Sequence, residues 1–437
     1  MRIGIIRSLT DSVSGGVFQY EMVFLDAISE LAATYPEQFI YLGYHANDIS
    51  TLATTGKLNY QNLPIVPLGI PQAQQRPPEA YFNQKPVTPP AEDPAKVQFN
   101  EAGGDLMRHA GVDLLLLLSP NLLGFSYRLP FIVPIFDLNH RIQPEFPEVS
   151  AFGETNKREY YYINTCRFAT FVLVDSEMGR ADVLRFYGEY INEDRVRVLP
   201  YYPPIARREF PDALALARVR GKYGLPPRYF FYPAQFWPHK NHALIIQAIK
   251  LIADQTGDVI PIVFCGAYWN YTMALHFKEL MTSAQRMGIA DRIHYLGPVP
   301  DSDMGALYTL STGLVMPTFF GPTNIPPLEA WHFGRPVITS DIPGLREQNG
   351  NASLLIDPRS PQALAEAMRR LWNDEGLCAD LATRGKQRLA SYSWSTFVDR
   401  IGTIVMEACE RITAGRTPRY PGVQAHNAAP AAPLNPV

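Results

Sequence analysis

The stretch from Tyr229 to Ile252, YFFYPAQFWPHKNHALIIQAIKLI, decides the fold. It begins with a strand-sized apolar run at 229–233 and passes through a loop that contains one proline and two large aromatic residues. It continues into a longer stretch, 241–254, whose apolar residues recur with the period of a helix. A buried strand, a loop and a covering helix form the repeating unit of a parallel sheet, so this stretch predicts one such unit.

The same alternation of short apolar runs and amphipathic stretches fills the chain in two series, which predicts an α/β protein with two Rossmann-like domains. The first series has a helix at 17–33 and strands at 2–7, 38–44, 113–118, 130–136, 171–175 and 196–199. The second has strands at 229–233, 259–265, 292–296, 313–316, 335–339 and 353–356, alternating with helices at 241–254, 271–287, 302–310, 326–333, 361–373 and 376–390.

Proline-rich segments mark the boundaries of these series. The cluster from Pro200 to Pro204 is a plausible linker between domains. Residues 68–97 are dense in proline and glutamine, which predicts a loop insertion in the first domain that shapes access of an acceptor. The predicted parts are domains at 1–200 and 205–393, a helix at 394–412 that returns to the first domain, and a disordered tail at 416–437.

Composition excludes several classes of protein. The formal net charge of -3 gives no reason to expect nucleic acid or a strongly anionic membrane as the main partner. The four cysteines are far apart and form no CxxC pair, which indicates neither a zinc site nor a disulfide framework. The opening residues, 1–6, are too short an apolar run for a signal peptide, and the run 114–118 is well short of a membrane span. We therefore expect a cytoplasmic protein, and a peripheral association with the inner face of a membrane stays open.

Two segments of the second half resemble a known family. Tyr232 to His242 resembles the strand–loop–helix of the retaining glycosyltransferases of family 4, the group 1 glycosyltransferases. Gly321 to Ala330, which runs into Gly334 to Asp341, resembles the donor-binding segment of that family.

Two segments of the first half extend the resemblance to about residues 1–412. Phe136 to His140, with Pro144 and Glu145, is similar to the "HDL…PE" region, and Val174 to Glu177 is similar to the "VSE" strand end. The resemblance implies the GT-B fold, in which two Rossmann-like domains face each other and the second holds a nucleotide-sugar donor in the cleft. It also implies transfer of a hexose, mannose or related, to a glycan or lipid-linked acceptor, with retention of configuration.

Lys240 is the first catalytic and donor-binding residue that the resemblance implies. It lies after a predicted strand and at the opening of a predicted helix, where a cation can neutralise a diphosphate and then the leaving nucleotide. An isolated lysine would more often be a solvated surface residue. Gln235 stands where the family usually has an arginine, so one phosphate-neutralising charge is absent at that position.

The segment before the predicted helix 326–333 supplies further donor-binding residues. Backbone N–H groups of Thr323, Asn324 and Ile325 are expected to point at the donor phosphates or sugar hydroxyls. Glu329 would lie one turn inside the helix, and its family counterpart accepts hydrogen bonds from ribose hydroxyls. The alternative is a structural role, in which Glu329 only interacts favourably with the helix dipole. The family's other glutamate falls on Gly321, which has no side chain to take its role.

The first half supplies the remaining candidates. His140 and Asp137 follow the predicted strand 130–136 and are candidate catalytic residues that contact the donor sugar or the acceptor hydroxyl, with a structural role as the alternative. The family's usual histidine is Phe136 here. Gly15 and Gly16 follow the first strand and precede a helix, and they are the expected acceptor and phosphate loop.

No metal or other cofactor is expected. Asp301-Ser302-Asp303 matches the DxD pattern of another glycosyltransferase fold, but it starts the predicted helix 302–310, where Asp and Ser are common caps. We therefore interpret it as a helix cap.

Two alternatives to a transferase stay open at this point. One is a sugar-nucleotide epimerase or a phosphorylase on the same fold. The other is a catalytically inactive partner subunit that binds a nucleotide sugar. The departures from the family pattern at Phe136, Gln235 and Gly321 are consistent with this alternative.

Overall fold

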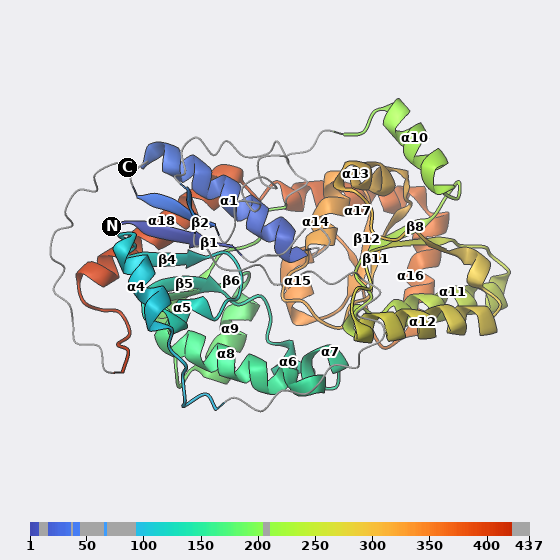
Figure 1. Cartoon of the computed structure of the whole chain (residues 1–437). Helices are drawn as coiled ribbons and strands as arrows, with labels where there is room; N and C mark the ends of the chain where they lie inside the picture. Colours follow the sequence, from blue (N-terminus) through green and yellow to red (C-terminus); the bar gives the residue numbers. More distant parts are fainter. Residues whose placement is uncertain (8–15, 36–37, 44–64, 68–92, 204–209, 422–437) are drawn as a thin grey trace.

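The computed structural model describes residues 1–7, 16–35, 38–43, 65–67, 93–203 and 210–421. These residues form two parallel β-sheets, each covered by helices, which lie side by side in the molecule (Figure 1). The Pro-rich segment predicted at 68–97 falls outside the described residues except for its last five, and Gly15 also falls outside them.

The first sheet has seven parallel strands in the order β3-β2-β1-β4-β5-β6-β7. Strands β1, β4, β5 and β6 are buried along their whole length because helices cover both faces, which is why they read as continuous apolar runs. The bounds are β1 Ile3–Ile6, β2 Phe39–Gly43, β3 Ile65–Pro67, β4 Leu114–Leu117, β5 Phe131–Pro134, β6 Phe171–Val174 and β7 Val196–Val198. The sequence did not predict β3, since three residues are too few to reveal a period.

The second sheet has six parallel strands in the order β10-β9-β8-β11-β12-β13. The bounds are β8 Phe230–Pro233, β9 Ile262–Cys265, β10 Ile293–Tyr295, β11 Gly313–Met316, β12 Val337–Ser340 and β13 Leu354–Ile356. Each falls on a strand predicted from the sequence. The predicted α/β class with two Rossmann-like domains is therefore confirmed.

Helices follow most strands and cover the sheets. The first sheet carries α1 Gly16–Thr34, α4 Glu101–His109, α5 Leu123–Ser126, α6 Asn139–Ile142, α7 Pro147–Ser150, α8 Glu154–Phe168 and α9 Glu177–Tyr187. The second carries α10 Ala213–Tyr223, α11 His242–Thr256, α12 Tyr271–Arg286, α13 Asp301–Leu310, α14 Ile325–His332, α15 Pro343–Asn349, α16 Pro361–Asn373 and α17 Glu375–Leu389.

The last helix, α18 Trp394–Thr413, returns from the second unit to the first, as predicted (Figure 1). It packs against α1, and its apolar face joins the core on that side of the first sheet. Phe397 and Ile401 are among the buried residues of this contact. Two crossings of the chain, one before α10 and one before α18, therefore connect the two units.

The first residues of the predicted disordered tail do not follow that expectation. Tyr420 is buried, its ring stacks on Phe168 at a centroid distance of 4.7 Å, and its hydroxyl donates to the carbonyl of Leu129 at 3.0 Å. A single aromatic anchor carries no period, so sequence patterning cannot reveal it. Residues 422–437 lie outside the described part.

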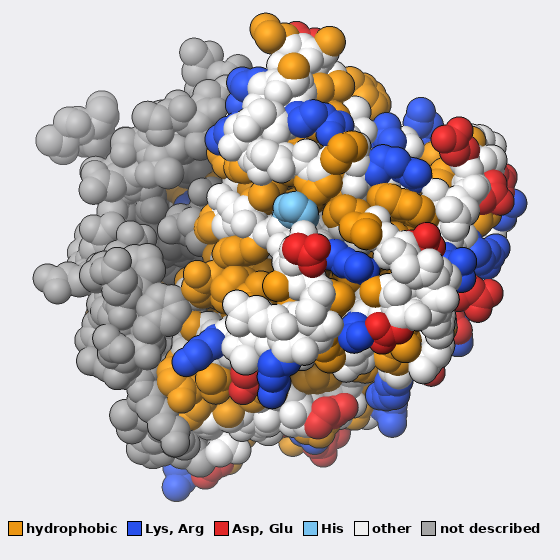
Figure 2. Space-filling view, turned by 90° about the vertical axis from the view of Figure 1, so that its right-hand side faces the viewer, with side chains coloured by type: hydrophobic (Ala, Val, Ile, Leu, Met, Phe, Trp, Pro, Cys, Tyr) orange, Lys and Arg blue, Asp and Glu red, His pale blue; other side chains and the backbone are white. Residues whose placement is uncertain are grey.

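Figure 2 looks onto the end of the second unit that faces away from the first. Basic and acidic side chains are scattered between apolar ones on this face, and neither sign forms a continuous field. In the described part of the chain, every helix is too short or too polar to cross a lipid bilayer.

Candidate functional site

A cavity of about 380 Å³ opens between the two units. Its walls come from the N-terminus of α1, from the loops after β8, β9 and β10, and from the start of α14. It thus lies beyond the carboxyl ends of the strands, where doubly wound sheets bind their ligands. The lining contains seven residues predicted from the sequence, which are Gly16, Gln235, Lys240, Thr323, Asn324, Ile325 and Glu329.

Lys240 ends a short 3₁₀ turn, Pro238–Lys240, between β8 and α11. Proline favours the start of such a turn, and Asn241 closes it in the left-handed conformation at φ 59°, which asparagine tolerates. The Asn241 amide donates to the carbonyls of Pro317 and Pro358 at 2.9 and 2.8 Å. The Tyr232 hydroxyl donates to the Lys240 carbonyl at 2.9 Å. The turn that carries Lys240 is therefore fixed from three sides.

Lys240 is half-buried where it lines the cavity. Burial lowers its pKa to about 8, against the opposing effect of the carboxylates of Asp137 and Glu148. The side chain therefore carries most of its positive charge at neutral pH, and a neighbouring anion would increase that charge.

Gln235 lines the same wall two residues after β8. Its side-chain oxygen accepts a hydrogen bond from the Trp237 indole at 3.0 Å. This contact directs the amide but supplies no charge in place of the family's arginine, so Lys240 is the cation that this segment contributes to the cavity.

The start of α14 differs from the sequence expectation. The N–H of Asn324 is already bound to the side-chain oxygen of Gln348 at 2.9 Å, and the Gln348 amide donates back to the Asn324 carbonyl at 2.6 Å. The prediction that the Asn324 N–H points at the donor is therefore wrong. Pro326 and Pro327 have no N–H, so this helix end offers few backbone donors to an anion.

The side chain of Asn324, unlike its backbone N–H, has a hydrogen-bond donor available to a ligand. Its amide nitrogen is buried without a hydrogen-bond partner among the described residues, and the residue lines the cavity. A buried amide without a partner costs free energy, so the group is suited to receive an acceptor atom from a ligand. The clamp of Gln348 fixes Asn324 in this orientation.

The position of the Asn324 side chain explains why residue 321 is a glycine. Its φ of 140° favours glycine, and a Cβ at this position would stand 2.2 Å from the amide nitrogen of Asn324. The place of the family's glutamate side chain is therefore occupied by Asn324. Any larger residue at 321 would have to displace that amide.

Glu329 lies one turn inside α14, as expected. The hydroxyl of Tyr308, which is fully buried, donates to its carboxylate at 2.7 Å. This contact sets the orientation of the carboxylate, which lines the cavity. A helix-dipole role alone would not need a buried hydroxyl to hold the group.

The wall from the first unit is mostly aromatic. Phe136 packs edge-on against Tyr20 at 5.0 Å, and Tyr201 packs against Tyr20 at 5.1 Å. Phe136 therefore replaces the family's histidine with a member of an apolar cluster that lines the cavity. Gly16 begins α1 at the same wall.

His140 does not line this cavity. Its ring is buried, Nε2 lies 2.8 Å from the Glu159 carboxylate and 3.0 Å from the Tyr187 hydroxyl, and Tyr162 stacks on it. These partners belong to α8 and α9, which hold the ring within the first unit. The structure thus supports the structural alternative over the catalytic one.

Asp137 is also outside the lining of the cavity. It accepts hydrogen bonds from the Arg158 guanidinium at 2.7 Å and from the N–H of Asn139 at 3.0 Å. Burial alone would raise the pKa of Asp137, but the Arg158 guanidinium outweighs it and holds this pKa below its usual range. The carboxylate contacts Arg158 and acts on the cleft through its electric field, which Lys240 and Tyr201 both experience.

The interpretation of Asp301-Ser302-Asp303 as a cap is wrong. The cap position is Pro300, and Asp301 and Asp303 both lie in the first turn of α13. Asp303 is buried and binds Arg218, Lys222 and Tyr223 at 2.6 to 2.8 Å. Asp301 accepts from the Gln19 amide of α1 at 3.1 Å. Within the described ranges, no group of three or more His, Cys, Asp or Glu side chains is arranged to hold a metal ion.

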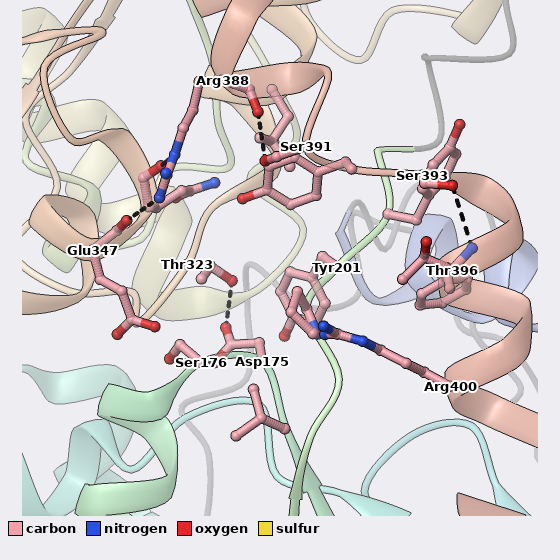
Figure 3. A pocket seen from close by; sticks show the side chains of 17 residues that line it. Asp175, Ser176, Tyr201, Thr323, Glu347, Arg388, Ser391, Ser393, Thr396 and Arg400 are labelled. Carbon is pink, nitrogen blue, oxygen red and sulfur yellow. Dashed lines mark hydrogen bonds between the residues drawn. The ribbon is translucent and has the colours of Figure 1, made fainter. Parts of the chain in front are cut away.

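A second, smaller cavity of about 240 Å³ lies beside the two chain crossings (Figure 3). Tyr201 and Thr323 line both cavities and separate them. The Thr323 hydroxyl donates to the Asp175 carboxylate at 2.5 Å, so its side chain already serves a contact between the units. Burial raises the pKa of Asp175 to about 6.

Several residues of the site could not be identified from the sequence. Tyr308, Gln348 and Gln19 act through partners that are 21 to 282 residues distant in the chain, and no local pattern marks them. A signal existed only for Glu148, which repeats the Pro-Glu pair three residues after Pro144-Glu145.

The comparisons with known proteins agree with this geometry. The family model described as "Glycosyl transferases group 1" matches residues 218–388, which contain β8 to β13 and the polar wall of the cavity. The chain is similar to the O-antigen chain mannosyltransferase B of Escherichia coli, with 26% identity over 277 residues, 60% of this chain and 70% of that protein.

Two further relatives match over smaller shares of their length. A serotype-specific mannosyltransferase WbdA of Escherichia coli is 25% identical over 59% of this chain, which spans 31% of that protein. A D-inositol 3-phosphate glycosyltransferase of Corynebacterium glutamicum is 22% identical over 55% of this chain and 58% of its own length.

Solved structures share the fold over nearly the whole chain. Anabaena HepE in complex with UDP has a TM-score of 0.65 at 17% identity and covers 93% of this chain and 100% of its own. Sucrose-phosphate synthase from Thermosynechococcus elongatus has a TM-score of 0.67 at 17% identity, over 95% of this chain and 100% of its own. The fold is thus that of the GT-B glycosyltransferases, and residues 218–388 match the model of the group 1 glycosyltransferases.

Proposed function

We propose that this glycosyltransferase moves a hexose, mannose or a related sugar, from a nucleotide-diphosphate sugar to a glycan or lipid-linked acceptor, with retention of configuration. The observation that carries the proposal is one polar wall. Lys240, the Asn324 amide and the Glu329 carboxylate line the same cavity from the second unit. The mannosyltransferases among the relatives support the sugar, and the neighbours solved with UDP and UDP-glucose support a nucleotide-sugar donor.

Each of these groups suits one part of such a donor. Lys240 provides the positive charge for the diphosphate, and the Asn324 amide donates to a phosphate or sugar oxygen. The Glu329 carboxylate accepts hydrogen bonds from ribose hydroxyls. The aromatic wall of Tyr20, Phe136 and Tyr201 provides an apolar surface opposite them.

The chemistry asks mainly for electrostatic stabilisation. The bond from the sugar C1 to the diphosphate oxygen breaks, and its electron pair leaves with the diphosphate. The acceptor hydroxyl oxygen bonds to C1, and its proton passes to a phosphate oxygen or to water. Lys240 stabilises the negative charge that grows on the leaving group, and the partial burial of Lys240 strengthens this effect. The proposed reaction uses no metal ion.

We place the enzyme in the cytoplasm. All four cysteines are free thiols, which agrees with a reducing compartment. A lipid-linked acceptor would bring the enzyme to a membrane surface, and this association remains part of the proposal.

The proposal is tested in two steps. A thermal-shift screen with nucleotide sugars identifies the donor, because a ligand that binds only the folded state raises Tm. The donor is then incubated with candidate glycan acceptors, and the anomeric configuration of the product is read by NMR. We expect transfer with the configuration of the donor.

The alternatives give different outcomes. Turnover of the nucleotide sugar without any acceptor would identify an epimerase, and release of a sugar phosphate with inorganic phosphate would identify a phosphorylase. Tight binding of the donor with neither hydrolysis nor transfer to any acceptor would identify an inactive partner subunit.

A further inference from the structure

Glu148 reaches across the cleft from the first unit to the turn that carries Lys240. It lies on α7, and one of its carboxylate oxygens accepts from the backbone N–H of His239 at 2.9 Å. The same oxygen lies 2.6 Å from Nδ1 of the His239 ring. One carboxylate of the first unit therefore binds both the backbone and the side chain of the residue before Lys240.

Residues close to Glu148 in the chain also contact the second unit. The Gln143 amide donates to the carbonyl of Phe319 at 2.9 Å, and the Phe146 ring lies 5.4 Å from that of Phe319. The N–H of Phe319 in turn donates to the carbonyl of His239 at 2.8 Å. Both backbone groups of His239 are thus engaged, one by Glu148 and one by the loop that segment 143–148 covers.

The charge of Glu148 depends on this contact. Its side chain is only 4% exposed, and its second oxygen is buried with no hydrogen-bond partner in the described part of the chain. Burial of a carboxylate is costly unless charges or donors of the surroundings compensate it. Apart from its own backbone N–H, the compensating groups are His239 and Lys240, which belong to the other unit. Contact between the units and placement of the turn are therefore coupled.

We propose that Glu148 is a positioning residue of this enzyme, whose carboxylate fixes the turn that carries Lys240. The inference rests on the proposed function, since it assigns Lys240 to the leaving diphosphate. It gives the first domain a direct part in the donor site, although the residues that face the donor come mainly from the second.

Two variants of Glu148 test the proposal, with two variants of Glu145 as matched controls. Glu145 lies three residues earlier on the same segment and is exposed. Glu148→Ala should lower kcat on the order of 10²-fold, the size expected when a reacting group is misplaced by about 1 Å. Glu148→Gln, which retains an acceptor oxygen for the His239 N–H, should lower it less and guards against a folding failure of the alanine variant. Affinity for UDP, measured by calorimetry, should stay near wild type in both.

The control variants Glu145→Ala and Glu145→Gln should retain the wild-type kcat. Equal kcat in the Glu148 and Glu145 variants would overturn the proposal. A loss of UDP affinity as large as the loss of kcat would also overturn it, because it would indicate general support of the nucleotide site.

The pH profile provides a readout that a purely structural role would not change. The titratable groups that face Lys240 are Asp137 and Glu148 from the first domain and His239 and His242 from its own segment. Because a carboxylate favours the charged ammonium, its loss in Glu148→Gln should lower the pKa of Lys240. The alkaline fall in kcat should then begin at a lower pH than in wild type. An unchanged alkaline limb would contradict the proposal.

A third measurement separates this proposal from the proposed function. Amide hydrogen exchange of the peptide 236–242, with saturating UDP, reports on the turn without any transfer reaction. Exchange should be faster in Glu148→Ala than in wild type or Glu145→Ala. Unchanged exchange would overturn the positioning role even in an active enzyme, whereas faster exchange in a chain that transfers no sugar would leave the role intact and refute only the transferase assignment.

Discussion

The two walls of the cleft follow the same kind of parallel sheet but present opposite surfaces. On the second unit, Lys240, Asn324 and Glu329 direct polar groups into the cavity. On the first, Tyr20, Phe136 and Tyr201 form an aromatic surface, and the polar residues nearby are engaged with partners of their own. We infer that the two walls have different roles, in which one binds the charge of the donor and the other excludes water from it.

The largest effect is expected when the positive charge of Lys240 is removed from the polar wall. Lys240→Ala should lower kcat on the order of 10²–10³-fold, or about 2.7–4 kcal/mol of transition-state stabilisation, as for other preorganised electrostatic groups. Lys250→Ala on α11 is the matched control, since Lys250 pairs with Asp254 away from the cavity. A wild-type rate in Lys240→Ala would remove this residue from the mechanism.

A second test concerns the nucleotide end of the same wall. Glu329→Gln retains the shape of the side chain and weakens its acceptors, and hydrogen bonds to charged groups contribute about 1.5–3 kcal/mol each. The affinity for the free nucleoside diphosphate of the donor should therefore fall on the order of tenfold, measured by calorimetry, and affinity for the intact donor should fall with it. If Glu329→Gln bound that nucleoside diphosphate as tightly as wild type, the ribose assignment would be wrong.

The first wall predicts a different kind of loss. His140→Ala removes a buried ring and leaves Glu159 and Tyr187 without one of their partners, which should reduce the free energy of unfolding by about 1–3 kcal/mol. The kcat of the folded fraction should not change. The exposed His109 provides the control variant, His109→Ala, and a drop in kcat at unchanged stability would return His140 to the catalytic residues.

The smallest effect is expected from chelation. Within the described residues, the carboxylates of Asp301 and Asp303 bind Gln19 and the group Arg218, Lys222 and Tyr223, and no metal-binding cluster is formed. Dialysis against EDTA should leave the transfer rate unchanged. Loss of activity that Mg²⁺ or Mn²⁺ restores would show that the leaving group relies on a metal as well as on Lys240.

The fold was accessible from the sequence because its signals are local and repeated. Buried parallel strands give continuous apolar runs, and covering helices give the 3.6-residue period, so each strand of the second sheet was predicted within three residues of its ends. Elements without such a signal were missed, as β3 and α15 show. The buried contact of Tyr420 with Phe168 was missed for the same reason, because a single side chain forms no repeating pattern.

By itself the sequence determined the class of fold, the resemblance to a family and the residues of the second domain that lie in continuous motifs, since Lys240, Asn324 and Glu329 stand within short segments with a recognisable pattern. Only the tertiary structure decided which polar groups remain available to a ligand. Gln348 accepts a hydrogen bond from the N–H of Asn324, and Asp175 accepts one from the hydroxyl of Thr323. Glu159 forms a hydrogen bond with the ring of His140. The physical reason is that each buried polar group must find a partner, and those partners come from elements far apart in the chain.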